Sequence, residues 1–242
     1  MTVLFIGSIF VGKVYVLAIL NHEGFMRSLI VAAFAASLSV STVAAQDHDP
    51  DHAIAGGGVI ADGWKARPDR GTLDNLNFRT MGAGFHVTVG PAVILYRDGD
   101  VARGSYEVSG SFRQTSSLGH AHGYGLIIGG GDLQGEAQRY TYFLVRGDGV
   151  FLVKKRNGTD LALLSEGPNG WAQHDAIHVE DADGQATNDL SILVSGGTVS
   201  FRINGTEVMQ LPASQVDVNG IAGMRINHNL DIHIGSFAIA QM

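Results

Sequence analysis

Cysteine is absent from the 242 residues, which excludes disulfides, thiolate catalysis and cysteine-based zinc sites. Proline is scarce, with 5 residues, whereas glycine is abundant, with 33. This balance is typical of many short strands joined by tight turns. Because no disulfide contributes, stability must come from packing alone, and the 45% of apolar residues is ample for a core.

Positive charge is also in short supply. The 16 Lys and Arg residues are scattered along the sequence and are outnumbered by 23 Asp and Glu, so the net charge is −7. A nucleic-acid partner needs a cationic stripe opposite its phosphates, and this composition therefore argues against one. We expect the acidity to serve solubility.

Two apolar stretches precede the domain. The second follows Met26, where Arg27 supplies a positive charge, residues 29–40 form an apolar run and residues 43–45 supply the small side chains of a cleavage site. This pattern predicts a signal peptide over residues 26–45, and hence a periplasmic or extracellular protein.

Residues 1–25 contain the first apolar stretch, interrupted by Lys13. A second hydrophobic segment seldom precedes a signal peptide, so we interpret residues 1–25 as an extension outside the translated protein, with the true start at Met26. The alternative is a genuine membrane anchor. The membrane is a partner only under that alternative.

Residues 46–58 show no apolar periodicity and are expected to form a flexible lead-in to a single domain over residues 59–242. If cleavage follows Ala45, His48 becomes the third residue of the mature chain. A free amine, two amides and this imidazole could then enclose Cu(II) or Ni(II). A solvated acidic tail is the alternative interpretation.

From Phe85 onwards, apolar residues recur with period two in short runs that end at glycine, asparagine or aspartate, which predicts antiparallel strands with one buried face. Asn204-Gly205 predicts a tight hairpin, since both residues accept positive φ. No convincing helical period occurs, so we predict an all-β, two-sheet antiparallel sandwich of the jelly-roll type. The alternating apolar positions are Tyr106, Val108 and Phe112; Leu190, Ile192 and Val194; Val199, Phe201 and Ile203; and Leu230, Ile232 and Ile234.

Several segments in the second half of the chain carry a family resemblance. They are Tyr124-Gly125-Leu126-Ile127-Ile128-Gly129-Gly130, Tyr140-Thr141-Tyr142-Phe143-Leu144-Val145-Arg146, and residues 149–153, 188–192, 199–205 and 220–225. Their order resembles the concanavalin A-like jelly rolls, particularly the laminin-G-like modules and the domain family named for 3-keto-disaccharide hydrolases. The likeness covers residues 104–242. It implies a concave sheet that cradles a saccharide or another extended ligand.

The catalytic glucanases of this broad fold carry a Glu-x-Asp-x-Glu or Glu-x-Asp-x-x-Glu strand, and this sequence contains no such run. Its densest acidic segment is Glu180-Asp181-Ala182-Asp183-Gly184, which is predicted to be a loop, or at best a fragment of a calcium-binding loop. The resemblance therefore implies a fold more strongly than an activity.

Tyr140, Tyr142, Arg146 and Trp171 are candidate ligand-binding residues. Aromatic faces stack on pyranose rings, and a guanidinium bonds sugar hydroxyls. The alternative is that the tyrosines pack in the sandwich while Arg146 covers apolar surface with its stem.

His120 and His122 are a second candidate pair for ligand binding. Placed on the same side of a strand, two imidazoles could hold a divalent metal or act as general acid and base. A metal would need a third ligand, so no cofactor is certain. The alternative is a pair of ordinary surface histidines near a glycine turn.

Together these observations favour an exported domain that recognises a glycan or another extended ligand. One alternative is a glycoside-acting hydrolase of the 3-keto-disaccharide type, with His120 or His122 in its chemistry. Another is a structural or adhesion module that binds an envelope protein. The missing paired-carboxylate motif favours recognition, and no residue is identified as catalytic.

Overall fold

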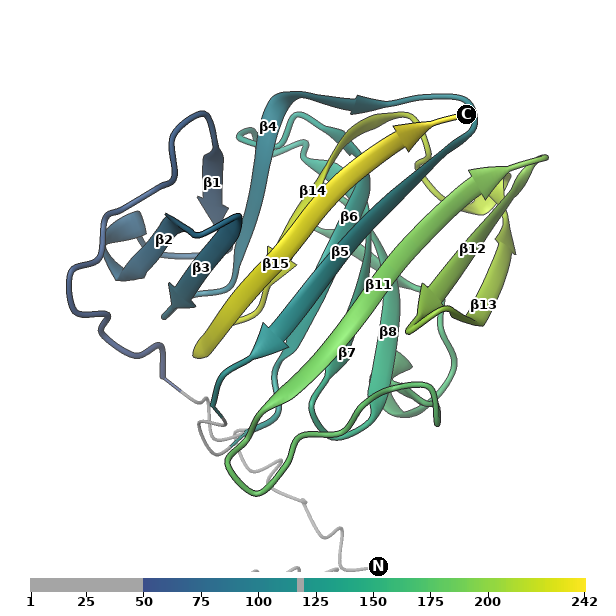
Figure 1. The fold of residues 1–242 in the computed structure, drawn as a ribbon. Coiled ribbons are helices and arrows are strands. Elements are labelled where there is room, and N and C mark those ends of the chain that lie inside the picture. The colour runs from purple at the N-terminus through teal and green to yellow at the C-terminus, as the bar shows by residue number, and fades with distance from the viewer. Residues whose placement is uncertain (1–49, 117–119) are drawn as a thin grey trace, which may run out of the picture. The chain divides into compact units, whose positions relative to one another are not determined.

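The computed structural model describes residues 50–116 and 120–242 (Figure 1). The predicted signal peptide over residues 26–45, the extension over residues 1–25 and the arrangement considered for His48 lie outside the described residues. Within the described ranges, no helix is long and apolar enough to cross a membrane.

Two antiparallel sheets pack face to face, which confirms the sandwich predicted from the sequence. In Figure 1, sheet A lies in front, with β15, β5 and β11 side by side, and sheet B lies behind it. Sheet A has the order β13 (Thr206–Pro212), β12 (Thr198–Ile203), β11 (Ala186–Ser195), β5 (Tyr106–Gln114), β15 (Leu230–Gln241), β3 (Gly84–Val89), β2 (Leu76–Met81).

Sheet B has the order β1 (Lys65–Pro68), β4 (Val93–Ala102), β14 (Gly220–Ile226), β6 (Gly123–Gly131), β7 (Arg139–Arg146), β8 (Val150–Asn157), β10 (Ala172–Gln173), and β9 (Asp160–Leu163) also pairs with β8. The described helices are the short 3₁₀ turns η1 (Leu73–Asn75), η2 (Pro168–Gly170) and η3 (Ala213–Gln215). Strands that are distant in sequence are neighbours in both sheets, as in the pairing of β5 with β11 and β15.

The alternation predicted for β5 is confirmed. Tyr106, Val108 and Phe112 point between the sheets and are fully buried, whereas Glu107 and Arg113 lie on the outer face. Successive side chains of a strand point to opposite faces, so an alternating sequence needs one buried side and one solvated side. In β11, β12 and β15 the predicted apolar residues are buried as well, and the outer face of sheet A carries mainly polar side chains, of which Ser200 of β12 is itself buried.

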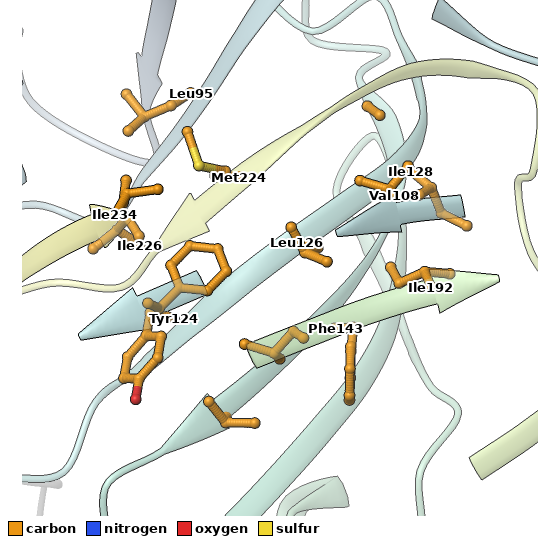
Figure 2. Packing of buried hydrophobic residues seen from close by; sticks show 14 of the residues in the cluster. Leu95, Val108, Tyr124, Leu126, Ile128, Phe143, Ile192, Met224, Ile226 and Ile234 are labelled. Atoms are coloured by element: carbon orange, nitrogen blue, oxygen red, sulfur yellow. The ribbon is translucent and has the colours of Figure 1, made fainter. Parts of the chain in front are cut away.

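The core lies between the inner faces of the two sheets. Figure 2 shows Val108 and Ile192 of sheet A close to Leu126 and Phe143 of sheet B. Phe201 of β12 is fully buried, and its ring meets that of Phe143 edge-on with 5.3 Å between centroids. Aromatic contacts across the sandwich therefore join the sheets without disulfides.

The predicted Asn204-Gly205 hairpin is present between β12 and β13. Asn204 has φ 50° and Gly205 has φ 80°, the left-handed conformations that a two-residue hairpin needs. The Asn204 side chain accepts a hydrogen bond from the Asp189 amide and donates one to the Asn188 Oδ1 atom, both at 2.8 Å. The turn residue therefore also anchors the hairpin to β11.

Replacing Phe201 by Ala should lower the free energy of unfolding by about 3 to 5 kcal/mol, because it removes a fully buried ring and leaves a cavity between the sheets. Denaturant titration measures this loss. Val101→Ala, at a side chain that is 40% exposed, is the control and should cost less than about 1 kcal/mol. Equal losses in the two variants would contradict the assignment of the inner face.

Candidate functional site

A groove of 460 Å³ lies on the outer face of sheet A. Its floor is formed by short side chains of β5, β11 and β15, and charged side chains from β5, β11 and β12 line it. The lining residues are Glu107, Ser109, Gly110, Ser111, Asp189, Leu190, Ser191, Arg202, Gly205 and Ser236.

Strand register explains why the sheet is hollowed here. Ser191 of β11 pairs with Ser109 of β5 on one side and with Arg202 of β12 on the other. One row away, Ser111 pairs with Asp189 and with Ser236 of β15. Paired residues share a face, so serines occupy the centre while longer side chains stand beside them. The groove is thus the space that short side chains leave in a continuous sheet.

Arg202 is the positively charged side chain of the groove. Its Nε atom is buried and has no hydrogen-bond partner, and within the described ranges the guanidinium forms no ion pair with Glu107 or Asp189. A buried donor without a partner carries a desolvation cost of about 1 to 3 kcal/mol. Because the Nε atom is closed off from solvent, a ligand in the groove would instead meet the terminal nitrogens of the guanidinium.

The aromatic candidates from the sequence lie on the other side of the sandwich. Tyr140 and Tyr142 are on the outer face of sheet B, in β7, and are 0% and 6% exposed. Their rings lie 5.7 Å apart within a second apolar cluster. Neighbouring side chains cover these rings. The cluster consists of Ile94, Tyr96, Ile127, Leu133, Tyr140, Tyr142, Leu144 and Leu152, with Trp171 and Ile221 packed against it.

Arg146 and Trp171 meet at the border of this cluster, and both are partly exposed. The Arg146 guanidinium carbon lies 4.5 Å from the centroid of the Trp171 ring, and the guanidinium also binds Asp148. A Cβ atom at Gly123 would lie 2.7 Å from Cη2 of Trp171, so the indole packs directly on the backbone of β6. The structure therefore brings these two candidates together beside the buried tyrosines.

An ion pair that sequence reasoning missed crosses the same face. Arg225 of β14 donates hydrogen bonds to both carboxylate oxygens of Asp69, at 3.0 and 2.5 Å, and to the Tyr140 hydroxyl at 3.2 Å. Arg225 also lies over the Tyr142 ring, 5.2 Å from its centroid. The two charged residues are 156 positions apart, and no local pattern links them.

Burial and charge act in opposite directions on this pair. Burial alone would raise the pKa of Asp69, but the hydrogen bonds and charge of Arg225, helped by Arg156 and Arg67, hold the pKa of that carboxyl below its usual value. Burial raises the pKa of the Tyr142 hydroxyl to about 12, although Arg225 opposes this. The pair is therefore charged at neutral pH, with the Arg225 side chain buried and that of Asp69 31% exposed.

The histidine candidates lie in the loop before β6 rather than on a strand, because the strand begins only at Gly123. The ring centroids of His120 and His122 are 6.4 Å apart, and those of His122 and His228 are 4.0 Å apart. His228 Nδ1 lies 3.5 Å from Asp51 Oδ1. Within residues 50–116 and 120–242, no group of three or more His, Cys, Asp or Glu side chains is arranged to hold a metal ion.

The acidic segment around Asp181 is a loop, as predicted. Oδ1 of Asp181 accepts hydrogen bonds from the amides of Asp183 and Gln185, each at 2.9 Å. This carboxylate stabilises its own turn.

No family model and no curated protein sequence matches this chain. Among solved structures, a carbohydrate-binding module CBM66 from Bacillus subtilis is similar, with a TM-score of 0.54 and 9% identity over 75% of this chain and 99% of that one. A β-glucanase from Bacillus licheniformis has a TM-score of 0.47 and 9% identity over 76% and 95%. The chain has the concanavalin A-like jelly-roll fold, which confirms the fold that the resemblance implied.

Asp69→Asn should lower the free energy of unfolding at neutral pH by about 3 kcal/mol, because it leaves the buried Arg225 charge without a carboxylate. Asp98→Asn is the matched control, since Asp98 pairs with Lys65 where both side chains are more than half exposed. That change should cost less than about 1 kcal/mol. Chemical denaturation of both variants measures the difference, and equal costs would contradict the structural role of the Arg225 pair.

Asp69→Asn should also change how the free energy of unfolding depends on pH in the acidic range. The pKa of Asp69 is lowered by folding, so its contribution is complete above the ordinary value of 3.8 and is lost as the pH falls through the lower folded value. Stability measured from pH 7 downwards should therefore fall less steeply below about pH 4 in Asp69→Asn than in the wild type. Parallel curves would contradict the lowered pKa.

Proposed function

We propose that this protein is a carbohydrate-recognition module that binds an extended glycan in the groove on the outer face of sheet A. The observation that carries the proposal is the lining of the groove. Four serine hydroxyls form its floor, and Glu107, Asp189 and Arg202 line it without pairing with one another in the described structure. Sugar hydroxyls both donate and accept hydrogen bonds, so such a lining suits them.

The fold supports this proposal. The similar solved structure with a TM-score of 0.54 is described as a carbohydrate-binding module. The jelly roll by itself hosts many functions, so the likeness adds support only because this chain has a groove of its own. We further propose that the protein works in the periplasm or outside the cell, where the signal peptide predicted over residues 26–45 would deliver it.

Recognition suits the groove better than hydrolysis. Glu107 and Asp189 are its two carboxylates, and Asp189 lies opposite Ser111, four residues along β5 from Glu107. Four residues of strand span about 14 Å. The carboxyl groups of glycosidases are about 5 to 9.5 Å apart, which is less than this backbone separation, so the register does not favour Glu107 and Asp189 as a catalytic pair. The hydrolase alternative would therefore need other residues.

Filling the groove tests the proposal. Ser191→Tyr places a large side chain at its centre on the solvated face of β11, so it should abolish glycan binding and leave the melting temperature nearly unchanged. A glycan array with the full-length protein identifies the ligand, and calorimetry measures the affinity of each variant. Ser195→Tyr is the matched control, because Ser195 lies on the same strand and face but outside the groove.

Three results of this experiment would count against the proposal. Undiminished binding by Ser191→Tyr would exclude the groove as the site. Release of sugar fragments by the wild type would favour the hydrolase alternative. No binding on any glycan would favour a protein partner of the cell envelope.

We propose a second, separate glycan-binding surface on the outer face of sheet B, where Arg146 and Trp171 meet at the border of the cluster that contains Tyr140 and Tyr142. Its support is the partial exposure of Arg146 and Trp171 beside a rigid aromatic cluster. Trp171→Ala should then weaken glycan affinity by about 1 kcal/mol, the value of one aromatic contact, at a temperature where circular dichroism finds the variant folded. An unchanged affinity together with a lower melting temperature would assign Trp171 to packing alone.

A further inference from the structure

Four basic side chains from four adjacent strands form one row on the outer face of sheet A. His86 of β3 pairs with Arg79 of β2 on one side and with His233 of β15 on the other, and His233 pairs with Arg113 of β5. Three strand spacings separate the first from the last, which is about 14 Å. We call these four residues the basic row.

The two arginines of the basic row bind neutral partners. Arg79 Nε donates to the Asn77 side-chain oxygen at 2.9 Å, and Arg113 donates to the Gln185 side-chain oxygen at 2.7 Å. Neither arginine forms an ion pair with a carboxylate of the described residues. Both are exposed, so each retains donors that can reach a ligand.

One carboxylate contacts the histidines. Asp231 Oδ1 lies 3.2 Å from His86 Nε2, and its Oδ2 accepts a hydrogen bond from Thr88 at 2.9 Å. Thr115 also donates to this carboxylate. The hydrogen bonds and ion pair of Asp231 go to Thr88, Thr115 and His86 rather than to Arg79 or Arg113, so the two guanidinium groups keep donors for a ligand.

The basic row borders the groove. Ser111, which lines the groove, and Arg113 lie two residues apart on the same face of β5, a separation of about 7 Å. A chain of sugars that fills the groove and continues along β5 therefore reaches the row. Glu107 lies four residues from Ser111 in the opposite direction and is remote from the row, whereas Asp189, which pairs with Ser111, is the groove carboxylate nearest to Arg113.

We propose that the glycan is acidic, with carboxylate or sulfate groups that bind the basic row while neighbouring sugar hydroxyls occupy the groove. The inference rests on the proposed function and adds the charge class of the ligand. Planar guanidinium groups bind carboxylate and sulfate oxygens through two parallel hydrogen bonds, and imidazole N–H groups add single donors. Although the protein has a net charge of −7, the basic row is a local cluster of basic side chains, and this cluster would favour an anionic polymer over a neutral one.

Matched pairs of polysaccharides test the charge of the ligand. Polygalacturonate is compared with its methyl ester, and dextran sulfate with dextran, using calorimetry on the full-length protein at low salt. We expect binding to one acidic polymer at least, about tenfold or more tighter than to its neutral counterpart, and weaker as salt is added. The two pairs separate carboxylate from sulfate as the preferred group.

Charge-neutral variants test the row itself. The double change Arg79→Gln and Arg113→Gln should weaken acidic-polymer binding by about tenfold and leave the melting temperature nearly unchanged, because both side chains are exposed. Arg103→Gln is the matched control: it removes one positive charge from an exposed position before the other end of β5. Its affinity should stay close to that of the wild type.

The outcomes separate this inference from the proposed function. Equal binding of acidic and neutral polymers, abolished by Ser191→Tyr but unaffected by the double change, would overturn the inference and leave the proposed function intact. An equal loss in Arg103→Gln would also overturn it, because net charge alone would then explain the effect. No binding to any polymer or to any member of the glycan array would overturn both.

Discussion

The packing of two sheets through their inner faces is the constraint on which the rest of the molecule depends. Without cysteine, the sheets are held together mainly by buried apolar contacts, and rings such as Phe143 and Phe201 meet across the sandwich. The central strands of both sheets therefore give one face to the core. A binding surface on the strands can therefore form only on one of the two outer faces. One of these faces is polar and the other is apolar.

The two outer faces differ because their strands follow different sequence patterns. Arg139–Arg146 of sheet B contains buried residues at consecutive positions, so both faces of that strand are covered, and its outer side forms a second apolar cluster. Tyr106–Gln114 of sheet A alternates strictly and leaves its outer side polar. The polar face can be hollowed by short side chains, whereas the apolar face is filled by its own rings and by the Arg225–Asp69 pair.

The candidate residues chosen from the sequence differ from those that form the groove. Tyrosine, tryptophan and histidine carry recognisable chemistry, and Arg146 and Trp171 do meet in the structure. A serine such as Ser191 shows no distinctive chemistry in the sequence, and it matters here because it and its cross-strand neighbour Ser109 are both short. A groove in a sheet depends on the side chains of several strands, so no single sequence segment predicts it.

The sequence by itself determined the local features of the fold, which depend on residues close to one another in the chain. Period-two alternation assigned the inner faces of β5, β11, β12 and β15, and Asn204-Gly205 specified its hairpin because both residues tolerate positive φ. Strand order and register were decided only by the tertiary structure, since they depend on how distant strands pack against a common core. The groove, the Arg225–Asp69 pair and the alignment of Arg79 with Arg113 all arise from that register. Scattered charges along the chain thus become a row on one face because pairing, rather than sequence distance, sets which side chains are neighbours.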